Sequence, residues 1–181
     1  MFSNTDYSIN LADYNSGNPI SNGTSIPLTK SEYTENPVLI TKTISSGSKK
    51  IGYIMYNSFT SNFDSQLNAA FLTLKNEAIT DLVIDFRYNG GGSVASALYL
   101  SSMITGQFKG QLFSKQFWNN KIKFSNPEQL EDHFTDQIDT GGLQESIHSL
   151  SLDKVHIITT GSSASASELV INGLKPYIDV I

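Results

Sequence analysis

One stretch decides the fold of this chain: Leu82-Val83-Ile84-Asp85-Phe86-Arg87-Tyr88-Asn89-Gly90-Gly91-Gly92-Ser93. Its first residues are apolar and β-branched, which predicts a buried strand. The three glycines predict a turn, and the apolar run over residues 94–104 predicts a buried helix. A strand that passes through a turn into a helix is half of a β-α-β unit, so this stretch indicates a parallel sheet.

The same alternation of strand and helix occurs on both sides of this stretch. Before it, residues 51–56 predict a strand, and the apolar spacing over residues 63–74 predicts one face of a helix. After it, residues 155–158 predict a third strand, residues 169–174 a third helix, and residues 179–181 the opening of a fourth strand. We therefore expect an α/β core with a mostly parallel sheet that is truncated at its C-terminus.

The chain divides into a connector and this core. Residues 1–48 are rich in Ser, Asn, Thr and Gly, which predicts a short β-rich connector. The core is expected to span residues 49–181. At 181 residues the chain is long enough to bury a core of its own without disulfides.

Residues 107–150 interrupt the α/β pattern and predict an insertion over one face of the core. We expect a hairpin of residues 111–117 and 121–124 around Asn119-Asn120, followed by an acidic surface helix over residues 128–134. The aromatic side chains near the hairpin predict a small satellite core, with a peptide-binding wall as the alternative: Phe113, Phe117, Trp118 and Phe124.

Composition excludes several kinds of site. The net charge of −5 comes from 17 acidic and 12 basic residues spread along the chain, so no basic stripe is available for nucleic acid. The chain has no cysteine, which excludes disulfides, thiolate nucleophiles and cysteine-ligated metals. His133, His148 and His156 lack the spacing of a metal site. We expect no metal, no other cofactor and no nucleic-acid partner.

The glycine turn carries one unusual charged pair. Arg87 is the only arginine of the chain, and Asp85 lies two residues before it, so the two side chains are expected to form an ion pair that braces the turn. Three glycines allow another backbone to approach closely. A phosphate-binding loop is not favoured, because its lysine is absent, and an ordinary turn is the alternative.

A second turn lies between the third predicted strand and the third helix: Gly161-Ser162-Ser163-Ala164-Ser165-Ala166-Ser167-Glu168. A serine at such a turn lies where the N–H groups of a helix start could stabilise a negatively charged oxygen, which is the geometry of acyl transfer. Ser165 and Glu168 also have the spacing of a capping box, in which the serine only satisfies a helix start. This turn alone leaves both interpretations open.

The two turns together resemble peptidase family S41, the C-terminal processing or tail-specific serine peptidases. The resemblance rests on Asp85-x-Arg87-x-Asn89-x-Gly91-Gly92 and on the Ser163 to Glu168 motif, in that order. It implies a core similar to the Clp protease and crotonase fold, with Ser165 as nucleophile. It also implies an oxyanion hole from the N–H groups of Ala166 and Gly91, and a polypeptide as substrate.

The family resemblance also implies parts that residues 1–181 do not supply. The general base of the family is a lysine in a motif further along the chain than Ile181, so we expect a catalytic-core fragment that is inactive alone. Lys175 is interpreted as an exposed helix-end cation and His156 as a strand residue. The family commonly has a PDZ-like domain before the core, of which residues 1–48 could be a remnant or linker. It is also commonly exported to the periplasm or cell envelope.

Two other functions remain open at this point. Relatives with this fold can bind peptides or other ligands without hydrolysing them. A crotonase-like acyl-CoA enzyme would use the glycine turn for its oxyanion but would not need Ser165.

Overall fold

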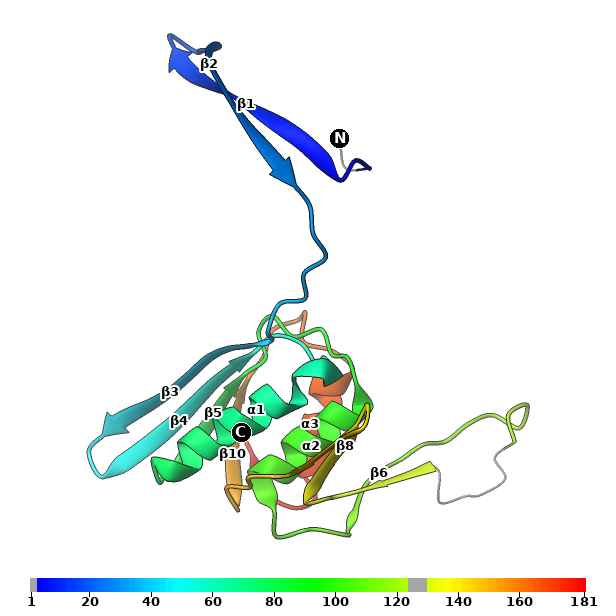
Figure 1. Ribbon diagram of the computed structural model, residues 1–181. Helices are drawn as coiled ribbons and strands as arrows, with labels where there is room; N and C mark the ends of the chain where they lie inside the picture. The colour runs from blue at the N-terminus through cyan, green and yellow to red at the C-terminus, as the bar shows by residue number, and fades with distance from the viewer. Residues whose placement is uncertain (1–2, 124–129) are drawn as a thin grey trace. The chain divides into compact units, whose positions relative to one another are not determined.

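The computed structural model describes residues 3–123 and 130–181. The chain forms two compact units, Met1–Glu35 and Asn36–Ile181 (Figure 1). Residues 36–48 therefore group with the core, whereas composition suggested a boundary after residue 48. The reason is that strand β3 (Val38–Ser46) pairs along its length with the first core strand.

The first unit is a β-hairpin. Strands β1 (Asp6–Asn15) and β2 (Asn18–Thr29) pair antiparallel, with Ile9 opposite Ile26. Almost every side chain of the hairpin is at least partly exposed to solvent. An isolated two-stranded hairpin buries too little surface to be stable by itself in water.

The second unit contains a five-stranded sheet in the order β11-β10-β5-β4-β3. Its strands are β3, β4 (Lys49–Tyr56), β5 (Asp81–Asp85), β10 (Lys154–Ile158) and β11 (Asp179–Val180). Neighbouring strands are parallel except for β3, which pairs antiparallel with β4. The predicted α/β core with a mostly parallel sheet is confirmed.

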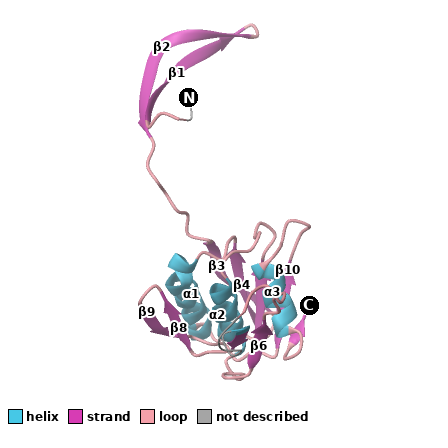
Figure 2. Cartoon of the chain, turned by 90° about the vertical axis from the view of Figure 1, so that its right-hand side faces the viewer, coloured by secondary structure: helices cyan, strands magenta, loops and turns pink. Residues whose placement is uncertain are grey.

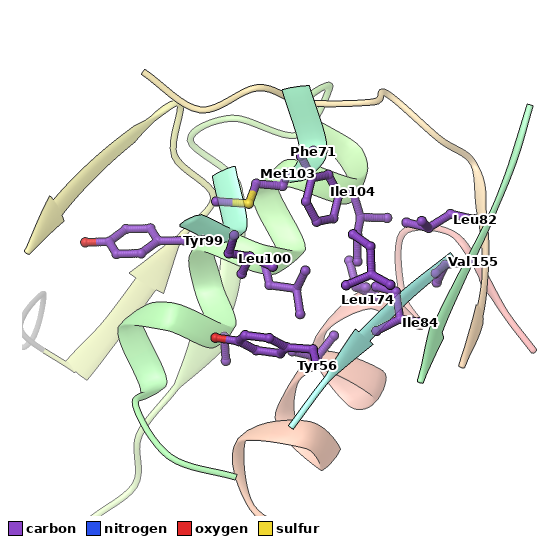
Figure 3. Close-up of a cluster of buried hydrophobic side chains, with 14 of the residues drawn as sticks. Tyr56, Phe71, Leu82, Ile84, Tyr99, Leu100, Met103, Ile104, Val155 and Leu174 are labelled. Carbon is purple, nitrogen blue, oxygen red and sulfur yellow. The ribbon is translucent and has the colours of Figure 1, made fainter. Parts of the chain in front are cut away.

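The helices α1 (Asp64–Asn76), α2 (Val94–Thr105) and α3 (Ala166–Leu174) contribute to one hydrophobic core, and a short 3-10 helix, Ser61–Phe63, precedes α1. Side chains of a strand alternate between faces, and the inward set of β4, β5 and β10 meets all three helices. Figure 3 shows members of this core, among them Ile84 and Val155 from the sheet, Phe71 and Leu100 from the helices.

The opposite face of the sheet is open within the described residues. Ile51, Val83, His156 and Ile158 alternate with the core residues and line a shallow apolar hollow there. Ile158 is 39% exposed.

The region between α2 and β10 contains four short strands: β6 (Leu112–Lys115), β7 (Glu131–His133), β8 (Gln137–Thr140) and β9 (Leu143–Ser146). The β8–β9 hairpin lies beside α1 and α2 (Figure 2). Hydrogen bonds join Glu145 of β9 to α1 through Asn68, and Asp139 of β8 to α2 through Tyr99. The predicted insertion is therefore attached to the helices.

The structure corrects two expectations for this region. β6 pairs antiparallel with β7, not with residues 121–124, and the acidic segment forms strand β7 where a helix was predicted. The physical reason is complementary polarity, because Lys115 and Ser114 on β6 bond Glu131 and Asp132 on β7. Phe124 and residues 128–129 lie outside the described residues.

The expected satellite core is correct in part. Phe113 is 5% exposed and stacks edge-on against Phe134, which in turn contacts Tyr177 and Phe108. Phe117 and Trp118 are exposed and do not join it. Phe113 also packs against Gly173 of α3, where a β-carbon would lie 2.3 Å from the ring.

We expect Gly173→Val to lower the free energy of unfolding by about 1–3 kcal/mol, because the added side chain overpacks the contact with Phe113. Urea unfolding followed by circular dichroism measures this. Gly161→Val is the matched control, since a β-carbon at Gly161 meets no atom within 4 Å. Equal stability of the two variants would show that α3 does not depend on this contact.

Candidate active site

Two turns meet where the parallel strands β5 and β10 end. The N–H of Phe86, just after β5, donates to the carbonyl of Ile158 at 2.8 Å. Beyond that point the hydroxyl of Thr160 donates to the carbonyl of Arg87, and the hydroxyl of Ser163 to the carbonyl of Phe86. Carboxyl ends of parallel strands are where open α/β sheets place their ligands.

Asn89 joins the two turns and is fully buried. Its side-chain amide donates to the carbonyl of Tyr56 at 2.9 Å, and its side-chain oxygen accepts from the N–H of Gly91 at 2.9 Å. Its backbone carbonyl accepts from the N–H of Ala164 and from the hydroxyl of Ser167. One residue thus fixes the end of β4, the glycine turn and the start of α3.

Sequence reasoning included Asn89 in the glycine motif without giving it a role. The available signal was its residue type, because asparagine side chains commonly bond the backbone two residues further on in a turn. The bonds to Ala164 and Ser167 could not be found in this way, since they depend on the parallel pairing of β5 with β10.

The structure brings the three predicted site residues together. Gly91 has φ +108°, and a β-carbon there would lie 2.7 Å from Cβ of Ser165 and 3.0 Å from N of Ala166. Gly92 has φ +140°, and a β-carbon there would lie 2.3 Å from the carbonyl oxygen of Phe59. Only glycine fits at either position.

Ser165 is exposed and has an unusual backbone conformation, φ 56° and ψ −113°. Such a conformation costs a residue other than glycine about 1–3 kcal/mol and is common at functional sites. The predicted capping box is present, and the N–H of Ser165 donates to the carboxylate of Glu168 at 2.7 Å. The serine is therefore held on a sharp turn at the first residues of α3.

The two expected oxyanion donors differ in their hydrogen bonding. Ala166 is the first residue of α3, and the N–H groups of a first helical turn have no carbonyl partner within the helix. The N–H of Gly91 is already bonded to the side-chain oxygen of Asn89. A substrate oxygen at this site would have to share that donor.

Asp85 and Arg87 form the expected ion pair beside the glycine turn. Nη2 of Arg87 lies 2.7 Å from Oδ2 of Asp85, and Nε bonds both carboxylate oxygens at 3.0 Å. Tyr53 and the N–H of Arg87 donate to the same carboxylate. The hydrogen bonds from the Arg87 side chain, with smaller contributions from Tyr53 and the Arg87 N–H, lower the pKa of Asp85 to about 2 against the effect of burial.

Other titratable candidates lie away from Ser165. His156 lies within β10 and lines the open face of the sheet, as expected of a strand residue. Lys175 is exposed at the end of α3 opposite to Ser165. His133 lies 3.8 Å from Glu131, and the backbone of His148 bonds Asn68. Among residues 3–123 and 130–181, no three His, Cys, Asp or Glu residues are grouped so that they could hold a metal ion.

Comparison with known proteins decides the family. The family model described as peptidase family S41 matches residues 50–178, which is more than half of the chain. The chain belongs to peptidase family S41. The S41 chain is 28% identical over 93 residues to the C-terminal processing peptidase, chloroplastic, of Tetradesmus obliquus, a match that covers 46% of this chain and 20% of that protein.

Solved structures agree with the S41 assignment. A Bacteroides fragilis protein assigned to the S41 proteases has a TM-score of 0.71 and 26% identity, covering 98% of this chain and 47% of that chain. The photosystem II D1 C-terminal processing protease shares the fold, with a TM-score of 0.54 and 22% identity over 84% of this chain and 37% of that one. This S41 chain thus spans less than half the length of these relatives. No helix among the described residues is long and apolar enough to cross a membrane.

We expect Asn89→Ala to destabilise the chain by about 1–3 kcal/mol or more, because it leaves the buried carbonyl of Tyr56 and the N–H of Gly91 without partners. Urea unfolding measures the loss. Asn120→Ala removes an exposed amide and should change stability by less than about 0.5 kcal/mol. Equal effects of the two substitutions would show that the hydrogen bonds of Asn89 do not stabilise the fold.

The ion pair predicts a pH dependence. Because the pKa of Asp85 is lowered to about 2 in the folded chain, its carboxylate stabilises the fold above the unfolded pKa of about 3.9. This stability is lost as the pH falls through about 2. The difference in unfolding free energy between the wild type and Asp85→Asn should be constant from about pH 5 to 7 and shrink between about pH 4 and 2.

Urea unfolding at each pH measures this difference. The carboxyls of Asp81, Glu131 and Asp136 also have lowered pKa values. They are present in both the wild type and the variant, so their contributions cancel in the difference of unfolding free energies. A difference as large near pH 2 as at pH 7 would show that the pair does not act through ionised Asp85.

Proposed function

We propose that residues 36–181 form the catalytic core of a serine endopeptidase of the C-terminal processing type, with Ser165 as its nucleophile. The observation that carries this proposal is the close contact between the two turns. Ser165 has a strained backbone at the start of α3, and Gly91 approaches it so closely that a β-carbon would not fit. An ordinary helix cap requires neither feature.

In the proposed reaction the hydroxyl of Ser165 attacks the carbonyl carbon of a peptide bond and forms an acyl-enzyme, which water then hydrolyses. A base must remove the hydroxyl proton. In a Ser/Lys dyad this is a neutral lysine, whose pKa burial lowers from about 10.4. Lys175 is exposed and lies at the wrong end of α3. As the family resemblance implies, we assign the base to a lysine outside residues 1–181.

Two backbone N–H groups are proposed to stabilise the negative oxygen of the tetrahedral intermediate. Ala166 supplies the first, at the positive end of the dipole of α3. Gly91 supplies the second, shared between the substrate and the side chain of Asn89. Each such donor contributes about 10²–10³-fold to the rate.

The proposed substrate is a polypeptide cleaved in its C-terminal region. Its support is that the relatives include two C-terminal processing peptidases. The proposed location is the periplasm or cell envelope. Fractionation of cells that make the full-length protein tests the location.

Binding of a peptide or another ligand without hydrolysis is the second candidate function. Two observations favour it: Ser165 and Glu168 form a capping box, and the N–H of Gly91 already has a partner. A serine that caps its own helix beside a satisfied donor does not require catalysis to explain its position.

Labelling of the full-length protein with a fluorophosphonate reagent, combined with a peptide-cleavage assay, separates the two functions. We expect labelling of the wild type and its loss in Ser165→Ala, with cleavage reduced by about 10⁴-fold or more. Ser162→Ala changes an exposed hydroxyl of the same turn and should retain both signals.

Labelling that persists in Ser165→Ala would remove Ser165 as the nucleophile. A folded wild-type protein that binds peptide but is neither labelled nor active would establish the binding function instead.

A further inference from the structure

An exposed loop continues from β6 and carries apolar side chains outward. The β6–β7 ladder ends at Gln116, whose N–H donates to the carbonyl of Leu130. Phe117 is 86% exposed, Trp118 52% and Ile122 47%. Figure 1 shows this segment, residues 116–123, extending from β6 away from the helices and the sheet. We call it the aromatic loop.

The aromatic loop has a defined turn. The side-chain oxygen of Asn119 accepts from the N–H of Lys121, and its carbonyl accepts from the N–H of Ile122. This arrangement is an Asx turn. The turn separates Phe117 and Trp118 on its first arm from Ile122 on its second. Three exposed apolar side chains are therefore presented by eight consecutive residues. Phe113 of the preceding strand β6, in contrast, is buried against α3.

The charge of the loop differs from that of the chain. Lys121 and Lys123 are exposed on the second arm, and residues 115–123 contain no acidic residue. The chain as a whole has a net charge of −5. Lys115, at the base of the loop, already pairs with Glu131. The loop thus combines two available cations with apolar and aromatic side chains on an otherwise acidic protein.

We propose that the aromatic loop binds the surface of a membrane that contains anionic lipids. Tryptophan is enriched where hydrocarbon meets lipid headgroups, because its ring is apolar and its N–H is polar. Each lysine near an anionic surface adds about 1 kcal/mol to binding. Charge favours the membrane over a contact between the aromatic loops of two copies, because such a contact would bring the same two lysines of each copy together.

Trp118 makes the proposal directly measurable, since it is the only tryptophan of the chain. Its fluorescence is recorded with phosphatidylcholine vesicles and with vesicles in which part of the lipid is phosphatidylglycerol. We expect a shift of the emission to shorter wavelength and co-sedimentation of the protein with the anionic vesicles only. Binding should weaken strongly in high salt, which screens the attraction.

Two double variants test the two contributions while keeping Trp118. Lys121→Glu with Lys123→Glu should weaken binding about tenfold or more. Phe117→Ser with Ile122→Ser should abolish the fluorescence shift, because the loop then has too little apolar surface to enter the headgroup layer. Leu72→Ser with Lys75→Glu, on the exposed side of α1, is the matched control and should bind as the wild type does.

Three results would overturn the proposal. The first is no association with anionic vesicles, or association that both loop variants retain. The second is a shift without vesicles that grows with protein concentration and accompanies dimers in sedimentation, which would make a second copy the partner. The third is an equally strong shift with polyglutamate, which would indicate an acidic polypeptide. None of these readouts depends on Ser165, so they test the loop separately from catalysis.

Discussion

The backbone carbonyl of Asn89 and its side-chain amide hold three segments of the second unit together. The amide bonds to the end of β4 and to Gly91, and the carbonyl bonds to Ala164 and Ser167 at the start of α3. Each partner is a polar group that would otherwise lack a hydrogen bond in a buried place. The position of the strained serine, the approach of the glycine turn and the direction of α3 all follow from this one residue.

The parallel sheet makes these hydrogen bonds of Asn89 possible. Parallel pairing of β4, β5 and β10 brings their carboxyl ends to the same edge, and the helices that follow β5 and β10 pack into one core. Asp85, Arg87 and Tyr53 form a hydrogen-bonded group that fixes the backbone just after β5. The glycines at 91 and 92 then let the backbone pass between Ser165 and Phe59.

Local patterns predicted the sheet, because strand, turn and helix periodicities repeat three times in order. The grouping of Ser165, Ala166 and Gly91 was implied by the resemblance of the two turns to family S41. Local patterns did not predict that the N–H of Gly91 bonds Asn89, since this depends on side-chain rotation within the turn. They also failed for residues 131–133. The acidic composition there predicted a surface helix, but the residues form strand β7, which pairs with β6. Similarly, Phe113 and Phe117 cannot be distinguished by residue type. Phe113 is buried because it packs against Phe134 and against Gly173 of α3.

The hydrogen bond between Ser167 and Asn89 spans 78 positions of sequence. On the ribosome, the glycine turn emerges long before α3 has been made, and Asn89 then has no Ala164 or Ser167 to bond. The strained serine and its neighbouring donors are brought together only after α3 docks. Under the proposed function, a nascent chain that has not yet made α3 therefore has no assembled nucleophile turn.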